Sequence, residues 1–254
     1  YFRRTHPLTP ASAFGGVTKA LENYGIPCGC CADGPSGIRM DCGTYAFALP
    51  NGTCMACSFN EDLVEQLYEM EGAELRKNRI DIQLGPGMNI HRNPLNGRNF
   101  EYFSEDPFLT GKMAAAQIRG MAKYQVTGAM KHFAANNQEY NRRLYNSVVS
   151  ERALREIYLK GYEIAVKESS PYAIMTTYGG INGIWTAGNY DLLTTILRNE
   201  WHYEGLVMTD WWAEINDEGQ TPVRTNVAAM VRSQNDVYMV TRDSGENANG
   251  DNLK

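Results

Sequence analysis

Charged and aromatic residues follow directly after several short apolar runs of the sequence. The combinations are residues 126–130 with Lys131 and His132, residues 173–177 with Tyr178, and residues 205–209 with Asp210 and Trp211. If these runs are parallel strands, their carboxyl ends meet on one face of the fold. We therefore expect these side chains, although far apart in the chain, to assemble into one site.

A carboxylate surrounded by fixed hydrogen-bond donors suits a ligand that is a polyhydroxylated ring. Asp210 supplies one carboxylate, and Asp33, in Asp33-Gly-Pro-Ser-Gly, supplies another. The candidate donors are Arg98, Lys131, His132 and Arg142. Sugar hydroxyls need paired partners and the C–H face of the ring needs an apolar platform, for which Trp211 is available. The residue types thus predict a sugar site.

Two other ligands fit the same residues less well. Phosphate is disfavoured because no Gly-rich phosphate loop accompanies the cationic side chains. A metal is disfavoured because the histidines form neither an HxH nor an HExxH pair. These four histidines are His6, His91, His132 and His202.

Each candidate residue also has a purely structural interpretation. Asp210 could cap a helix, and Lys131 with His132 could be a solvated surface pair. Trp211 and Tyr178 could be ordinary packing residues, and Arg98 could pair with Glu101 or Glu105. The shared position at strand ends is what favours the functional interpretation.

Strand-like and helical segments alternate, which indicates βαβ units and a parallel sheet. Strands are expected at residues 80–82, 126–130, 173–177, 205–209 and 237–240, and helices at residues 61–77, 106–123, 150–167 and 189–200. No Gly-x-Gly-x-x-Gly follows a strand, which disfavours a dinucleotide-binding sheet. The 254 residues match the usual size of a (β/α)₈ barrel. We predict such an α/β barrel over residues 1–243, with allowance for an incomplete or irregular first unit.

The net charge and the lengths of the apolar runs exclude some classes of partner. The net charge of −5 argues against nucleic acid and anionic membrane surfaces. No apolar run reaches the ~18 residues that a membrane span needs. Residues 244–254 are polar and are expected to form a tail or the stub of a linker. The chain starts at Tyr1 without a leader, so we expect it to be part of something larger, with a cytoplasmic location favoured over a secreted one.

All six cysteines precede residue 58, and they allow three interpretations. They are Cys28, Cys30, Cys31, Cys42, Cys54 and Cys57. Free thiols are the favoured interpretation, followed by a disulfide and then by zinc. The irregular spacing before Cys54 and the lack of a nearby histidine disfavour zinc.

The order of the motifs resembles the catalytic barrel of family 3 glycoside hydrolases, in particular its β-glucosidase branch. The motifs are Asp33-Gly-Pro-Ser-Gly, Gly97-Arg-Asn-Phe-Glu-Tyr-Phe-Ser-Glu-Asp-Pro107, Lys131-His-Phe133, Asn136-Asn-Gln-Glu-Tyr-Asn-Arg142, Ser150-Glu-Arg-Ala-Leu-Arg-Glu-Ile-Tyr158, Met175-Thr-Thr-Tyr178 with Ile181-Asn-Gly183, and Val207-Met-Thr-Asp-Trp211. One departure is Tyr178-Gly179, where the family often has Tyr-Asn.

The resemblance implies a role for each candidate residue. Asp210 would be the nucleophile of a retaining exo-β-D-glucosidase that removes terminal non-reducing glucosyl residues from β-glucosides or short β-glucan oligosaccharides. Tyr178 would sit beside Asp210, and Trp211 would flank the sugar ring. The sugar hydroxyls would be held by Asp33, Arg98, Lys131, His132 and Arg142. No metal or cofactor is implied.

The resemblance also implies that the acid/base residue lies outside this chain. In this family the acid/base glutamate comes from an α/β-sandwich domain, which we expect outside this chain, on another segment or a second chain. Glu101, Glu139 and Glu214 are available here, but each fits a structural position better. An alternative is a non-catalytic sugar-binding or structural barrel that lacks its acid/base.

Overall fold

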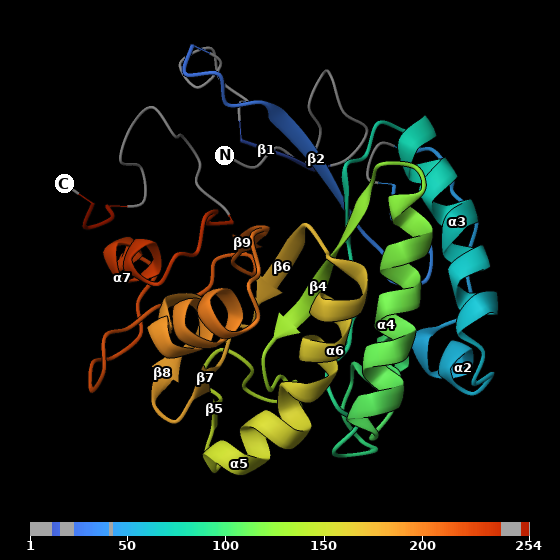
Figure 1. The fold of residues 1–254 in the computed structure, drawn as a ribbon. Coiled ribbons are helices and arrows are strands. Elements are labelled where there is room, and N and C mark those ends of the chain that lie inside the picture. The colour runs from blue at the N-terminus through green and yellow to red at the C-terminus, as the bar shows by residue number, and fades with distance from the viewer. Residues whose placement is uncertain (1–11, 16–22, 41–42, 240–249, 254) are drawn as a thin grey trace.

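The computed structural model describes residues 12–15, 23–40, 43–239 and 250–253 (Figure 1). Its main sheet has six strands in the order β1-β2-β3-β4-β6-β9. These strands are β1 (Ser12–Gly15), β2 (Cys28–Asp33), β3 (Ile82–Leu84), β4 (Thr127–Phe133), β6 (Ala173–Thr176) and β9 (Leu206–Met208). β1 runs antiparallel to β2, and every later neighbour in the sheet is parallel.

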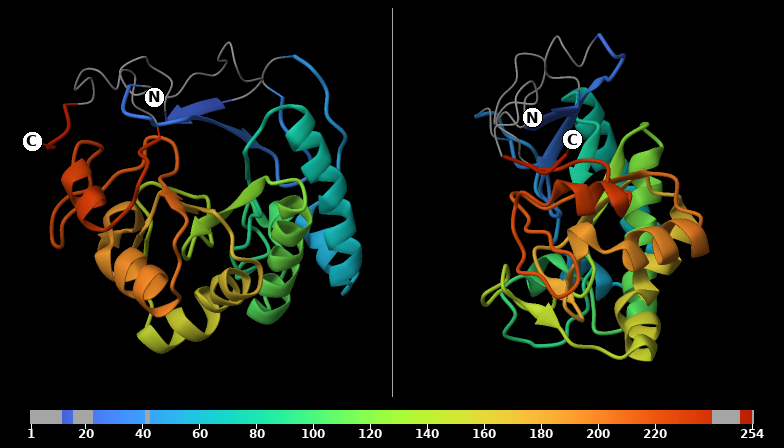
Figure 2. Two further views of the ribbon diagram at one scale, coloured as in Figure 1. Left: turned by 45° about the horizontal axis from the view of Figure 1, so that its top comes forward. Right: turned by 90° about the vertical axis from the view of Figure 1, so that its left-hand side faces the viewer.

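This sheet is the barrel-like fold predicted from the sequence, with the irregular first unit that the prediction allowed. Figure 2 shows the strands curling with the long helices along the outer side. Val237 extends the curl beyond β9 through a parallel bridge to Met208. Within the described ranges no strand pairs β9 with β1, so the strands form an open half-barrel.

Two long helices begin where their capping residues predict. In α3 (Glu61–Lys77) the Asn60 side chain accepts from the Leu63 N–H at 3.0 Å. In α4 (Pro107–Ala122) the Asp106 side chain accepts from the Phe108 N–H at 2.8 Å, and proline fills the first helical position. Both predicted helices are confirmed.

The other two predicted helices are less regular. The segment expected over residues 150–167 consists of α5 (Glu151–Ala153), the π-helical turn η2 (Leu154–Tyr158) and α6 (Lys160–Ser169). The last, η4 (Asp191–Glu200), is π-helical throughout. The short elements are α2 (Gly52–Ala56), η1 (Asn99–Glu101), η3 (Thr186–Gly188) and α7 (Val227–Arg232), with a small sheet of β5 (Asn146–Ser147), β7 (Gly180–Ile181) and β8 (Ile184–Trp185).

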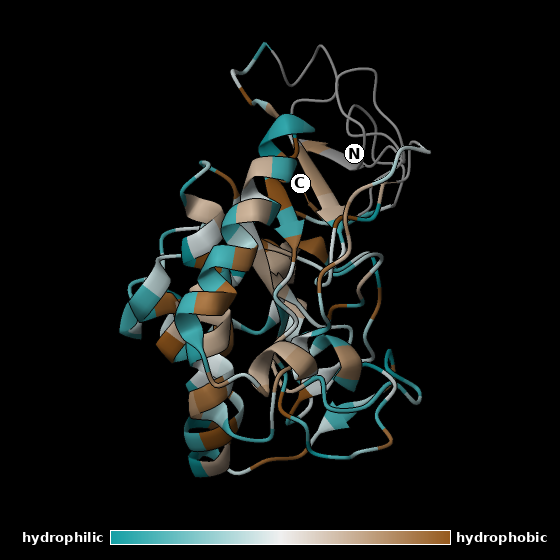
Figure 3. Cartoon of the chain, turned by 90° about the vertical axis from the view of Figure 1, so that its right-hand side faces the viewer, coloured by the Kyte–Doolittle hydropathy of each residue, from teal (hydrophilic) through white to brown (hydrophobic). Residues whose placement is uncertain are grey.

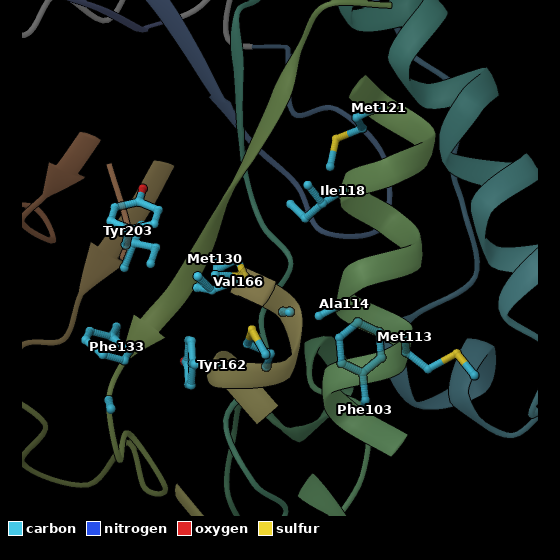
Figure 4. Close-up of a cluster of buried hydrophobic side chains, with 14 of the residues drawn as sticks. Phe103, Met113, Ala114, Ile118, Met121, Met130, Phe133, Tyr162, Val166 and Tyr203 are labelled. Atoms are coloured by element: carbon cyan, nitrogen blue, oxygen red, sulfur yellow. The ribbon is translucent and has the colours of Figure 1, made fainter. Parts of the chain in front are cut away.

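The core lies between the sheet and its covering helices. The helices carry interleaved hydrophilic and hydrophobic residues, as expected when one face meets the sheet and the other meets solvent (Figure 3). Figure 4 shows side chains of α4 and α6 directed toward Met130 and Phe133 of β4. The Phe133 ring packs edge-on against Tyr162, with centroids 5.0 Å apart. This packing anchors the end of β4 that enters the site.

Helices α3 and α4 approach each other so closely that Gly120 is required at their contact. A Cβ atom at this position would lie 2.4 Å from the backbone oxygen of Glu65. None of the helices in the described part of the chain is long and apolar enough to cross a membrane. Of the predicted tail, residues 244–249 and 254 lie outside the described residues, whereas Asn252 accepts a hydrogen bond from the Ala228 N–H at 2.8 Å.

The cysteine prediction is tested where the thiols are described. Cys31, Cys54 and Cys57 form no disulfide, which confirms the free-thiol interpretation for these three residues and means that the Cys54/Cys57 pair is not bridged. Cys42 lies outside the described residues. In the ranges that the structure covers, no three His, Cys, Asp or Glu side chains are grouped so that they could hold a metal ion.

Candidate active site

The carboxyl ends of four parallel strands bring the predicted residues together. Asp33 ends β2, Lys131 and His132 lie near the end of β4, Tyr178 follows β6, and Asp210 follows β9. Lys131 Nζ donates to Asp33 Oδ1 at 2.9 Å, and His132 Nε2 lies 3.8 Å from Asp210 Oδ2. Residues up to 177 positions apart in the sequence thus form one cluster, as their strand-end positions predict.

Asp210 is buried at the centre of this cluster. Its Oδ1 atom accepts from the Trp211 N–H at 2.7 Å, whereas Oδ2 accepts no hydrogen bond of normal geometry. The Tyr178 hydroxyl nevertheless lies close enough to help stabilise the carboxylate. A turn, not a helix, follows it, so the helix-cap interpretation of Asp210 is wrong. Burial raises the pKa of Asp210, while Arg98, the Trp211 N–H and Lys131 oppose that rise by stabilising the carboxylate. The result is a desolvated carboxylate with one buried oxygen, Oδ2, that accepts no hydrogen bond of normal geometry among the described residues.

Arg98 and Lys131 share the buried carboxylate of Glu101. The Arg98 Nε atom donates to Glu101 Oε1, and Lys131 Nζ lies 3.7 Å from Glu101 Oε2. Burial disfavours the charge of Arg98, but Glu101, Tyr102 and Asp210 outweigh burial and raise its pKa. The structural interpretation of Arg98, a pair with Glu101, is therefore confirmed, and the same guanidinium also acts electrostatically on Asp210.

Lys131 and His132 are not a surface pair, because each is only 2% exposed. On its other side Lys131 meets Asp33, which also accepts from Arg39 Nη1 at 3.1 Å. Burial would raise the pKa of Asp33, but Lys131, Arg39 and the Gly34 N–H together lower it to about 2. Asp33 is therefore ionised over the whole physiological range and is ready to accept from hydroxyl groups.

A buried acid–amide contact lies behind the Asp33 loop. Gln83 of β3 donates to the Gly34 oxygen at 2.6 Å and to Glu71 Oε1 of α3 at 2.5 Å. Glu71 is fully buried, and its Oε2 atom has no described hydrogen-bond partner. Burial, assisted by Glu74, raises the pKa of Glu71 to about 8. Glu71 is thus held in its neutral form at pH 7.

Replacing Glu71 by Gln is expected to raise the free energy of unfolding by on the order of 2–3 kcal/mol at pH 7–8 and to change it little near pH 4. The folded-state pKa of Glu71 lies above its unfolded value, so its contribution is fully present below the unfolded pKa and is lost as pH rises toward 8. Glutamine cannot ionise and keeps an amide contact with Gln83. Denaturant unfolding at several pH values measures the difference.

Glu69→Gln, on an exposed part of the same helix, is the matched control and should show no comparable gain. Glu69 makes only a solvent-exposed ion pair with Lys123, at 3.0 Å. A Glu71→Gln gain that is the same at pH 4 and pH 8 would show that ionisation of Glu71 is not the cause.

Tyr178 lies under two arginines. The guanidinium carbons of Arg142 and Arg143 lie 4.6 and 4.3 Å from the centre of its ring. Burial raises the pKa of Tyr178, and the negative charge of Asp210 raises it further. Arg142 also pairs with Glu139 at 2.9 Å. Tyr178 thus connects the predicted Arg142 electrostatically with Asp210.

The two tryptophans differ in exposure. Trp211 is half-buried and packs against the cluster that contains Met175 and Met208, whereas Trp212 is 44% exposed. Arg143, which the sequence did not single out, donates to the Trp212 oxygen at 2.8 Å and so ties this segment to Tyr178. The sugar-facing role of Trp211 stays a prediction.

Sequence reasoning missed several residues that shape the site. They are Arg39, Tyr102, Asn136 and Arg143. Tyr102 and Asn136 stand inside motifs that were recognised and Arg39 lies two residues after one, so a signal was present, but only the fold shows what each contacts. For Arg143 the sequence offered a weaker indication, namely its position directly after the candidate residue Arg142.

The fold and the site together define a class of protein. A barrel-like sheet with a desolvated carboxylate at its strand ends, surrounded by cations, hydroxyls and aromatic rings, is typical of barrels that process carbohydrates. The family model described as "Glycosyl hydrolase family 3 N terminal domain" matches residues 9–250. The chain belongs to this family, which confirms the resemblance seen in the motifs.

Three relatives illustrate the match. A β-glucosidase of Ruminococcus albus is 63% identical over 238 residues, which is 93% of this chain and 25% of the relative. A β-glucosidase structure from Paenibacillus barengoltzii superposes with a TM-score of 0.94 at 60% identity, over 97% of this chain and 28% of that one. The structure of β-glucosidase 3B from Thermotoga neapolitana in complex with α-D-glucose superposes with a TM-score of 0.83 at 40% identity. The match covers 92% of this chain and 32% of that one. The chain therefore spans about a quarter to a third of these relatives.

Proposed function

We propose that the protein containing this chain is a retaining exo-β-D-glucosidase and that this domain supplies its nucleophile, Asp210, and its first sugar subsite. The observation that carries the proposal is the buried Asp210 carboxylate, whose Oδ2 atom accepts no hydrogen bond of normal geometry among the described residues and faces His132. The names of the relatives support the same activity. Terminal non-reducing β-D-glucosyl residues are the proposed substrate.

The proposed mechanism has two displacement steps. Asp210 Oδ2 attacks the anomeric carbon, the bond from that carbon to the leaving oxygen breaks, and the leaving oxygen takes a proton from a general acid. This forms a glycosyl ester on Asp210. The deprotonated general acid then removes a proton from water, which attacks the same carbon and releases the sugar and the Asp210 carboxylate.

Two features of the site favour this use of Asp210. Arg98 and Lys131 act against the effect of burial and so favour the ionised, nucleophilic form. Desolvation at the same time keeps water from competing for the carboxylate, which makes it more reactive than an exposed one. Asp33, Lys131 and His132, which lie in the same cluster as Asp210, would supply one acceptor and two donors for the sugar hydroxyls.

We propose that the general acid is a glutamate from outside this chain, in an α/β-sandwich domain or a second chain. A retaining pair of carboxyl groups lies about 5–5.5 Å apart. The nearby glutamates are already engaged: Glu101 binds Arg98 and Lys131, and Glu139 binds Arg142. The short share of each relative that this chain covers is consistent with a further domain.

Trapping with a 2-fluoro-β-glucoside tests the proposal on the full-length protein. The fluorine slows both steps, and a good leaving group lets the first step proceed, so the glycosyl ester accumulates. Mass spectrometry of the digest should find one added fluorosugar on the peptide that contains Asp210. A label on another peptide contradicts the assignment, and a protein that binds glucose without labelling or turnover is the non-catalytic sugar-binding barrel.

A further inference from the structure

A line of buried polar side chains runs behind His132 to the edge of the site. Glu139 Oε1 lies 3.2 Å from Asn136 Nδ2, which lies 3.0 Å from the Tyr102 hydroxyl. That hydroxyl lies 3.2 Å from His132 Nδ1. On the opposite edge of the ring, His132 Nε2 faces Asp210. Tyr102, His132 and Asn136 are each at most 3% exposed, so these contacts do not compete with bulk water.

The chemistry of the partners fixes the direction of each hydrogen bond. A carboxylate only accepts, so the Asn136 amide must present its nitrogen to Glu139, and the same nitrogen then donates to the Tyr102 oxygen. The Tyr102 hydrogen is left to donate to His132 Nδ1, its remaining polar neighbour among the described residues. Burial raises the pKa of Tyr102, so the phenol keeps this hydrogen throughout the working pH range.

His132 must then carry its own hydrogen on Nε2. Burial, together with Arg98, Lys131 and Arg142, lowers the pKa of His132 well below its usual value, so the ring is neutral and holds a single hydrogen. The backbone on either side is fixed as well, because Asn89 accepts from the His132 N–H at 2.8 Å and donates to its carbonyl at 2.9 Å. The separation of 3.8 Å from Asp210 is too long for a hydrogen bond, which leaves the Nε2–H available to a ligand.

We propose that Tyr102, oriented by Asn136, is a positioning residue that locks His132 in the tautomer with hydrogen on Nε2, so that the ring donates to a hydroxyl of the sugar bound beside Asp210. The other tautomer would present a lone pair to the sugar and to the Asp210 carboxylate. Only the identity of the ligand in this inference rests on the proposed function.

The tautomer is measured directly by solid-state ¹⁵N NMR of the full-length protein with ring-labelled histidine. Protonated and unprotonated imidazole nitrogens have well-separated shifts, and the His132 signals are assigned by their loss in His132→Gln. We expect the wild-type protein without ligand to show a hydrogen on Nε2 and none on Nδ1, and Tyr102→Phe to show both tautomers. A hydrogen on Nδ1 in the wild type, or an unchanged spectrum in Tyr102→Phe, overturns the proposal.

Kinetics on an aryl β-glucoside give a second readout. Tyr102→Phe should lower kcat/KM about tenfold in the wild type but less than about twofold in a His132→Ala background, because Tyr102 acts through His132. Equal losses in both backgrounds would mean that Tyr102 acts through packing and would overturn the positioning role. Because the NMR measurement does not depend on enzymatic activity, its result stands even if Asp210 is not the nucleophile.

Tyr203→Phe is the matched control. It also removes a buried phenol that donates one hydrogen bond, here to the Leu206 oxygen at 2.9 Å, but at the start of β9, away from the strand ends that carry the site. It should leave the His132 signals and kcat/KM unchanged. A Tyr203→Phe effect as large as that of Tyr102→Phe would show that loss of any buried phenol hydroxyl perturbs the site, and the inference would fail.

Discussion

Asp210→Asn is expected to lower kcat on aryl β-glucosides by at least ~10³-fold, because an amide cannot form the covalent intermediate. The amide is nearly the same size as the carboxylate and can still meet the Trp211 N–H through its oxygen, so the fold and the sugar subsite should survive. Glucose binding, measured by calorimetry or by protection against thermal unfolding, should therefore remain detectable while turnover is lost. Steady-state kinetics and the binding measurement together test the assignment.

Asp236→Asn provides the control, because this carboxylate contacts the strand that leads to Asp210 but lies outside the cluster. Asp236 accepts from the Val207 N–H at 2.7 Å and pairs with Arg198, so its loss should lower stability without a comparable loss of kcat. If Asp210→Asn keeps more than about a tenth of the wild-type kcat, covalent catalysis at Asp210 is excluded. Recovery of turnover in Asp210→Gly by added azide, with formation of an α-glucosyl azide, would identify the missing group as the nucleophile.

The strand-end rule explains why much of the site was predictable from the sequence. Residues 126–130, 173–177 and 205–209 are mostly apolar or β-branched because parallel strands are buried on both faces, and the charged residue that follows such a run lies at or near the strand end. The positions of Lys131, His132 and Asp210 follow from that alone. Their mutual contacts need only the additional knowledge that the strands are neighbours.

β2 escaped prediction because its sequence, Cys-Gly-Cys-Cys-Ala-Asp, lacks β-branched and aromatic residues. Position 29 requires glycine because the Phe14 ring of β1 fills the space that a Cβ would need. The nearest ring atom lies 2.5 Å from where that Cβ would be. The pairing partner, not the local sequence, makes this segment a strand. Asp33 was still predicted, but from its motif and not from the strand that carries it.

Contacts behind the first layer of the site could not be predicted at all. Tyr102 and His132 are 30 residues apart, and Gln83 reaches Gly34 across 49 residues. No periodicity encodes such pairs, because they depend on the register between strands and on the path of the loops. The π-helical turns are a similar case, since apolar spacing predicts a helix without distinguishing its hydrogen-bond pattern.

Arg98→Ala is expected to lower kcat/KM roughly 30- to 800-fold, which corresponds to a loss of about 2–4 kcal/mol of transition-state stabilisation. The reason is that buried charge-assisted hydrogen bonds to the sugar are lost. It should also move the acid limb of the kcat/KM profile to higher pH. Arg98 is the main charge that opposes the burial effect on Asp210, so its removal raises the Asp210 pKa further. Asp210 must be ionised to attack, hence activity is lost at a higher pH as the solution is acidified.

Two variants separate the charge of Arg98 from its shape. Arg98→Lys keeps a cation near Asp210 but loses the fixed fork of donors, so the acid limb should return toward the wild-type pH while kcat/KM stays low. Arg119→Ala removes an arginine of α4 that pairs with Glu65 at 2.9 Å, away from the strand ends, and should change neither quantity. An acid limb that stays fixed in Arg98→Ala would mean that Arg98 does not control the ionisation of Asp210 and that its effect lies in sugar binding alone.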